Sequence, residues 1–250
     1  GSYINMMTRQ VLSEKSPLYG RRTAQIRLAP LSFCEIQEHY ATVPFAELVE
    51  QYAVTGGVPK YMEFFANDST LMENIARTVL NTNGFLYDEP AFLLNKEVKE
   101  PVNYYSIMKV IAAENHKLSE IASAMQVESN RLTPYLETLQ GLYLLEKRVP
   151  VTENNPEKSR KGLYVMRDIF MRFWFKFVFP YKGELELDNL NFVLSKLNEH
   201  FIDNHVAFVY EDICRNIFAE LCKKRPTNYD RSFLLSQLVG NVGEKCHLAS

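Results

Sequence analysis

The sequence lacks the patterns that mark several common protein classes. Its 250 residues include only 10 glycines and 11 prolines, and no segment of about 20 to 50 residues repeats, which excludes collagen-like, solenoid and propeller architectures. The formal net charge is −2, which excludes a histone-like protein that binds nucleic acid over its whole surface. With 46% hydrophobic and 12% aromatic residues, the chain can still fill a sizeable core.

Cysteine is also sparse, and its spacing excludes a secreted disulfide scaffold. There is neither a CxxC pair nor a dense cluster, a pattern that favours a reducing compartment, and we expect a cytoplasmic protein. The four cysteines are Cys34, Cys214, Cys222 and Cys246.

No segment is apolar over the length of a membrane span. The most apolar stretch, residues 169–181, is shorter than the roughly 20 residues required and contains Arg172 and Lys176, so we expect a buried helix and no membrane partner. The chain begins with Gly1 and Ser2 and has no basic or apolar leader, so no signal peptide is predicted.

Motifs of catalysis and nucleotide binding are absent as well. The sequence contains no GxxxxGK[ST] loop, no GxGxxG after a strand, no HExxH and no GxSxG. The five histidines are scattered, and His200 and His205 are five residues apart, so they point in different directions on a helix. We therefore expect surface histidines and predict neither a metal site nor a serine–histidine triad.

What the sequence does contain is helical periodicity. Four segments place apolar residues at spacings of three and four and predict short helices: 33–40, 45–52, 58–65 and 71–80. Gly56 and Gly57 should end the second of them. Pro59 should open the third, because a proline in the first helical turn loses no hydrogen bond.

The middle of the chain predicts a winged helix, so the expected fold class is mainly α with a small β-hairpin. Three helices with a tight turn between the last two should be followed by two strands, and this is the helix-turn-helix order with a wing. Ser129 is the expected N-cap of the third helix, and Gly141 should end it. The helices are predicted at 104–113, 118–125 and 129–140, the strands at 142–151 and 163–166, and two further helices at 190–201 and 206–221.

A winged helix offers candidate contacts to DNA. Basic residues on the wing could bind phosphates: Lys147, Arg148, Lys158, Arg160 and Lys161. The third helix exposes little that could read bases, only Asn130, Arg131, Thr133 and Glu137, and Glu128 and Glu137 would repel phosphates. Contact of the wing with the DNA backbone is therefore favoured over sequence readout. The aromatic run of residues 170–179 is interpreted as core rather than as a base-stacking surface.

Several motifs in order resemble archaeal-type P-loop ATPases of the AAA+ and STAND group. The matching segments are GSYINMM (1–7), SPLYGRRTAQIRLAPLSF (16–33), YAVTGGVPKYM (52–62), FLYDEPAFLL (85–94) and the region from Tyr104 through RDIFMRFWFKFV (167–178). In that family an ATPase core with Walker motifs precedes a helical lid, a winged helix and a C-terminal domain similar to PD-(D/E)xK nucleases. This chain resembles the part that follows the Walker motifs.

The resemblance implies a sequence of domains. The expected order is the end of the ATPase core with its sensor strand (1–30), a helical lid (31–98), the winged helix (99–181), a linker with the start of a truncated nuclease-like domain (182–222) and a divergent tail (223–250).

The resemblance also implies roles for individual residues. Arg21 and Arg22 of the GRR stretch would stabilise charge in phosphoryl transfer. The expected nucleotide contacts are Ser2, Gly56, Gly57 and Pro59, and a nucleotide sensor at this corner should face a cleft shared with Arg21 or Arg22. Glu211 matches one acid of the nuclease-like domain, but its later acids are missing, so neither metal binding nor nuclease activity is expected.

The function that follows is an ATP-dependent switch acting on DNA. ATP and magnesium are cofactors of intact members of the family. Neither is expected to bind tightly to this chain alone, and the chain alone should not hydrolyse ATP. The implied partners are DNA, the missing ATPase core and a further copy of the chain. The alternatives are a winged-helix transcriptional regulator and a protein-interaction module, both without nucleotide chemistry.

Overall fold

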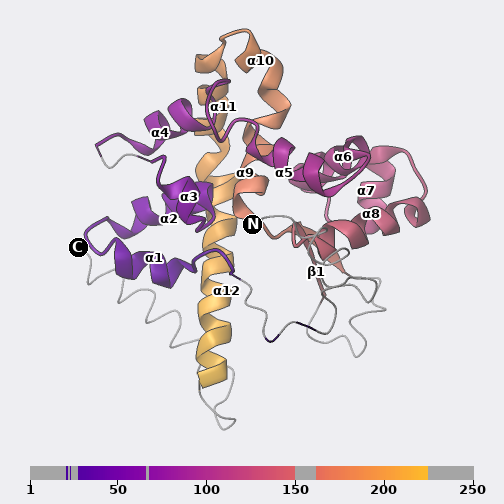
Figure 1. Ribbon diagram of the computed structural model, residues 1–250, viewed down its shortest axis with the longest axis horizontal. Coiled ribbons are helices and arrows are strands. Elements are labelled where there is room, and N and C mark those ends of the chain that lie inside the picture. Colours follow the sequence, from indigo (N-terminus) through magenta and orange to yellow (C-terminus); the bar gives the residue numbers. More distant parts are fainter. Residues whose placement is uncertain (1–20, 22, 24–27, 66–67, 150–161, 225–250) are drawn as a thin grey trace. The chain divides into compact units, whose positions relative to one another are not determined.

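The structure is a computed structural model, and it describes residues 21, 23, 28–65, 68–149 and 162–224 (Figure 1). It is mainly helical with one small antiparallel sheet, which confirms the expected fold class. The chain forms two compact units: residues 1–29 with 64–194, and residues 30–63 with 195–250. The domain boundaries given above stay predictions, because compactness alone does not test them. Within the described ranges, no helix combines the length and the apolar character needed to cross a membrane.

The second unit is built from helices of both chain segments. Helix α2 packs against α1, α12 and the π-helical turn η4. Ser32 and Glu35 form a capping box that starts α1, with the Ser32 hydroxyl accepting from the Glu35 amide. The helices are α1 (Phe33–His39), α2 (Phe45–Thr55), α3 (Pro59–Met62), α11 (Leu190–Phe201, which begins in the first unit), η4 (Ile202–Val206) and α12 (Ala207–Lys224).

The predicted corner between α2 and α3 is confirmed. Helix α2 ends at Thr55, and Gly56 and Gly57 follow with φ of 62° and 73°, in the left-handed region that glycine enters at little cost. Pro59 then occupies the first turn of α3.

The first unit contains the three helices of the predicted helix-turn-helix and the hairpin. Helix α6 packs against α7, α8 and α9, and α7 packs against α8. Its elements are α4 (Leu71–Thr78), α5 (Glu89–Glu97), α6 (Pro101–Ala112), α7 (Leu118–Met125), α8 (Ser129–Gly141), β1 (Leu145–Arg148), β2 (Leu163–Met166), α9 (Ile169–Phe177), the 3-10 turn η3 (Phe179–Tyr181) and α10 (Lys182–Glu186).

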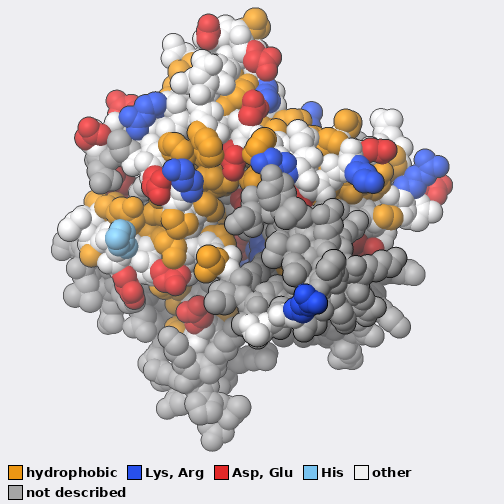
Figure 2. All heavy atoms as spheres, in the orientation of Figure 1, with side chains coloured by type: hydrophobic (Ala, Val, Ile, Leu, Met, Phe, Trp, Pro, Cys, Tyr) orange, Lys and Arg blue, Asp and Glu red, His pale blue; other side chains and the backbone are white. Residues whose placement is uncertain are grey.

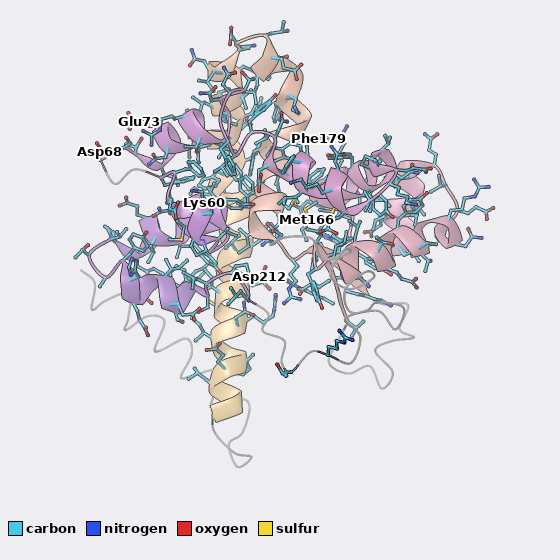
Figure 3. The ribbon with its side chains drawn as sticks, in the orientation of Figure 1. Lys60, Asp68, Glu73, Met166, Phe179 and Asp212 are labelled. Atoms are coloured by element: carbon cyan, nitrogen blue, oxygen red, sulfur yellow. The ribbon has the colours of Figure 1, made fainter. Side chains whose placement is uncertain are left out.

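The aromatic run forms the core of this unit, as expected. Trp174 and Phe173 are fully buried, and Phe170 and Phe175 are each 1% exposed. Phe179, labelled in Figure 3, lies parallel to the ring of Tyr105 at 5.8 Å between centroids. The rings of Phe170, Phe173, Trp174 and Phe175 therefore pack in the interior and offer no surface for stacking bases.

The hairpin is joined to the start of α7. Strands β1 and β2 pair antiparallel, from Leu145 opposite Met166 to Arg148 opposite Leu163. An isolated bridge pairs Lys117 with Leu163, and the Tyr164 amide donates to the His116 carbonyl at 2.8 Å. The residues before α7 thus lie along β2 like a short third strand.

Some local predictions were wrong. Helix α8 begins at Ser129 itself, with Glu128 as N-cap, and Gly141 is its last helical residue rather than its terminator. The left-handed residue that turns the chain is Tyr143, with φ of 61°. The turn that follows the helix occupies residues 142–144, so β1 begins at Leu145, later than the predicted strand.

Candidate nucleic-acid interface

The outward face of α8 carries little charge. Its apolar side, which includes Leu132, Leu136 and Leu139, is buried. The predicted contacts Asn130 and Arg131 are exposed, as are Glu128, Thr133, Pro134 and Glu137. Figure 2 shows acidic and basic side chains interspersed over the described surface of the face that it draws. A basic recognition helix is therefore not part of this interface.

The hairpin places two of the predicted basic residues on β1. Arg148 donates to the Glu146 carboxylate, which offsets part of its charge. Lys147 lies across Gly162, where an added Cβ would come within 2.2 Å of the Lys147 Cε atom. The remaining predicted wing residues, Lys158, Arg160 and Lys161, lie outside the described residues.

A cluster of charged groups holds the hairpin against the three helices. The Glu114 carboxylate accepts hydrogen bonds from His116 Nε2 at 3.2 Å and from Lys176 Nζ of α9 at 2.5 Å. His116 Nδ1 lies 3.0 Å from the Tyr164 carbonyl of β2. On the α7 side, Glu120 accepts the backbone amides of His116 and Lys117.

The contacts of both His116 ring nitrogens favour the protonated ring. A carbonyl oxygen and an ionised carboxylate can only accept, so both ring nitrogens must carry hydrogen for both contacts to form. The hydrogen bond to Glu114 accordingly raises the pKa of His116, against an opposing effect of burial. Burial would raise the pKa of Glu114, but its bonds to His116 and Lys176 outweigh this and lower it to about 2. The cluster is therefore complete while His116 is an imidazolium.

We expect the free energy of unfolding of the first unit to fall as the pH rises above the ordinary histidine pKa of about 6.5. The pKa of His116 is raised in the folded state, so its contribution is complete below the unfolded pKa and is lost as the pH rises through the folded one. The loss should be on the order of 0.5 kcal/mol for a partly exposed pair. Urea unfolding followed by the fluorescence of Trp174, the sole tryptophan, measures it.

Two variants test the assignment. His116→Gln should flatten this pH dependence, whereas His39→Gln, at an exposed histidine of α1, should leave it unchanged. A slope that survives in His116→Gln would contradict the role of this cluster. In acid, the ionised Glu114 carboxylate stabilises the folded state because its pKa is lowered there. This contribution to the free energy of unfolding should be lost as the pH falls below about 4.5.

The Gly56 and Gly57 corner of the second unit is packed against the chain's own backbone. The Leu31 amide donates to the Gly57 carbonyl at 2.8 Å, and the Tyr52 hydroxyl donates to the Leu31 carbonyl at 3.4 Å. A Cβ at Gly57 would lie 2.1 Å from the Leu31 oxygen. The close approach of Leu31 and the positive φ together require glycine here.

His205 contradicts the expectation of surface histidines. It is 1% exposed, and its Nε2 lies 2.7 Å from the Ala53 carbonyl near the end of α2. A carbonyl accepts, so Nε2 carries the hydrogen. His205 belongs to the turn η4, and it thereby binds this turn to the helix that precedes the corner.

Arg21 of the GRR stretch and the glycine corner lie in different compact units. Arg21 is exposed and belongs to the first unit, whereas Gly56, Gly57 and Pro59 belong to the second. The cleft expected between them stays a prediction. Ser2 and Arg22 lie outside the described residues.

The described acidic residues do not gather into a metal centre. Glu211, the candidate nuclease-like acid, is exposed on α12 and pairs with Arg215, which also bonds to Asp212 (labelled in Figure 3). Across residues 28–65, 68–149 and 162–221, no group of three histidine, cysteine or acidic side chains is placed to hold a metal ion.

A shallow pocket of about 40 Å³ lies in the second unit between α1, α2 and α12. Cys34 and Tyr52 are among its lining residues. Burial, together with nearby acidic groups, raises the pKa of Tyr52 to about 12, so the phenol is neutral. The pocket has room for water molecules but not for a nucleotide.

The sequence did not predict the hydrogen-bonded contacts that join distant segments within each unit. It identified neither the His116 cluster nor the docking of Leu31 on Gly57, and it did not predict α5. The adjacent glycines were the available signal for the second feature, because a glycine pair often marks a close approach of backbone.

Comparison with known proteins gives two similarities. Residues 174–233 match the DUF234 family model, described as archaea bacterial proteins of unknown function. The chain is also similar to an archaeal protein. It is 33% identical over 225 residues to the uncharacterized protein MJECL04 of Methanocaldococcus jannaschii, covering 89% of this chain and 49% of that protein. The chain thus spans about half the length of this relative. No solved structure matches this chain.

Proposed function

We propose that this chain is part of an ATP-dependent switch and that residues 99–181 are its nucleic-acid-binding winged helix. The observation that carries the proposal is the arrangement of α6, α7 and α8 with a hairpin whose second strand also pairs with Lys117. A short strand before the second helix and a hairpin after the third are the parts of a winged helix.

The distribution of charge favours contact with the phosphate backbone. The exposed face of α8 includes Arg131 but also Glu128 and Glu137, which oppose phosphates. Lys147 of the hairpin and Arg167, exposed directly after β2, supply cations beyond the helix. A few such contacts give weak binding that depends on salt and little on sequence.

The nucleotide part of the proposal rests on the motif resemblance. At the corner, the close approach of the Leu31 oxygen accounts for the absence of a side chain at Gly57, whose φ is also positive. The described residues therefore supply no feature that requires a bound nucleotide, and we derive no catalytic step. ATP and magnesium would be bound by the intact protein.

A salt titration tests the DNA contact. We expect the 250-residue chain to bind a fluorescent blunt duplex in anisotropy measurements, with affinity falling by about 10- to 40-fold between 50 and 200 mM salt for two to three phosphate contacts. Lys147→Glu should weaken binding to all sequences alike and reduce the salt slope by about one. Lys196→Glu, a charge reversal in the second unit, is the matched control.

The alternatives predict other outcomes. A transcriptional regulator would prefer one sequence and lose that preference in Asn130→Ala and Arg131→Ala. A protein-interaction module would bind no duplex even at low salt, and that result would overturn the proposed DNA contact.

A further inference from the structure

An aromatic residue occupies the left-handed position at the end of α8. The Leu144 amide donates to the Leu139 carbonyl at 3.0 Å and the Tyr143 amide donates to Gln140, which closes the helix in a Schellman-type turn. The turning position is usually glycine, because a Cβ is strained at positive φ. Among the described residues, the other non-glycine residues with positive φ are polar: Glu114, Gln126 and Asp188.

Tyr143 is more exposed than the residues that flank this turn. Leu142 and Leu145, on either side of the turn, are 4% and 2% exposed and belong to the core. The Tyr143 side chain is 40% exposed. Tyr143 therefore lies partly at the surface, beside a turn that Leu142 and Leu145 anchor in the core.

Arg167 completes a two-part surface with this ring. Its backbone amide donates to the Leu144 carbonyl at 2.9 Å, which ties the residue after β2 to the turn. Its guanidinium carbon lies 5.5 Å from the centre of the Tyr143 ring, within the range of a cation–π contact. Arg167 is itself exposed. An accessible aromatic ring beside a guanidinium is the combination that stacks a nucleobase and binds its phosphate.

We propose that Tyr143 and Arg167 form a stacking site for an unpaired nucleobase. The module would then prefer a duplex with a single-stranded tail over a blunt duplex. This inference rests on the proposed nucleic-acid contact and adds the class of nucleic acid that is bound. Lys147 would supply contact to the duplex backbone, and Tyr143 would supply the preference for the tail.

The test compares a blunt duplex with the same duplex carrying an unpaired tail, using the 250-residue chain. We expect the tailed duplex to bind about fivefold more tightly or better, the effect of one stacked base. A 2-aminopurine in the tail should lose fluorescence on binding. Tyr143→Phe should keep both effects, whereas Arg167→Ala should weaken the preference.

Tyr143→Gly is the decisive variant, because glycine suits the left-handed turn. The melting temperature should be unchanged or higher, while the preference for the tailed duplex and the 2-aminopurine signal should disappear. Binding to the blunt duplex should remain, and Lys147→Glu should weaken binding to both duplexes. A preference that survives in Tyr143→Gly would overturn the stacking site and leave the proposed DNA contact standing. If the unaltered chain binds neither duplex, both proposals fail.

Discussion

Replacement of Trp174 by alanine should lower the free energy of unfolding of the first unit by about 3 to 5 kcal/mol. The side chain is fully buried, and its Nε1 donates to the Tyr87 carbonyl at 2.6 Å. Its ring contacts Phe175 and Phe179, with centroids 5.0 and 5.3 Å apart. Alanine would leave a cavity among these rings and an unsatisfied carbonyl.

Two further variants separate these contributions. Trp174→Phe keeps much of the volume but removes the donor to Tyr87, so it should cost about 1 to 3 kcal/mol. Phe92→Ala, at a ring that is 53% exposed, should cost less than about 1 kcal/mol. Urea unfolding followed by circular dichroism measures all three, because both Trp174 variants lack the sole tryptophan and its fluorescence. Similar losses for Trp174→Ala and Phe92→Ala would contradict the central place of Trp174.

The helices around α6, α7 and α8 could be predicted because their apolar residues repeat on one face. Ile107, Ile121 and Leu132 are among the buried residues that the spacing placed inward. The ends of the elements were harder to predict. Nothing in local sequence shows that Tyr143 takes the left-handed position, since glycine is the ordinary signal for it and Gly141 lies two residues earlier.

Helix α5 illustrates a different limit. It starts after Asp88, which makes no capping hydrogen bond with its side chain, and Pro90 stands in its first turn. Only Pro90 and Leu94 are buried within it, so its sequence carries a weak apolar period. Tertiary contact, such as the Tyr105 hydroxyl donating to the Ala91 carbonyl, supports a helix that local signals leave open.

The buried position of His205 could not be predicted from helical periodicity. Residues four apart advance by about 40° beyond a full turn in an α-helix, so a long series of them drifts off one face. The π-helical turn η4 interrupts this drift between α11 and α12. As a result Phe201, His205 and Val209 are all buried. The sequence predicted two helices, 190–201 and 206–221, that left His205 between them as a surface histidine.

The candidate site was only partly visible in the sequence for a related reason. Hydrogen bonds between distant segments leave no periodic pattern, and the bonds of Glu114 to Lys176 and of His116 to Tyr164 are of this kind. Residue type predicted the glycine corner and marked Lys147 and Arg148 as basic positions of the hairpin. The partners of each group came only from the fold.

Gly57→Ala should destabilise the second unit by about 2 to 3 kcal/mol. A left-handed backbone with φ of 73° is unfavourable for alanine, and the new Cβ would lie 2.1 Å from the Leu31 oxygen. Backbone cannot move aside as a flexible side chain does. The segment must therefore shift and lose the hydrogen bond from the Leu31 amide to Gly57.

Hydrogen exchange gives a measurement specific to this contact. In Gly57→Ala the amide of Leu31 should exchange faster than in the unaltered chain, and circular dichroism should show earlier unfolding in urea. Gly183→Ala is the matched control, because a Cβ at Gly183 in α10 meets nothing within 4 Å. Alanine there should leave stability unchanged or raise it by up to about 1 kcal/mol. If Gly57→Ala and Gly183→Ala behaved alike, with the Leu31 amide still protected, the corner would be held by contacts other than the one between Leu31 and Gly57.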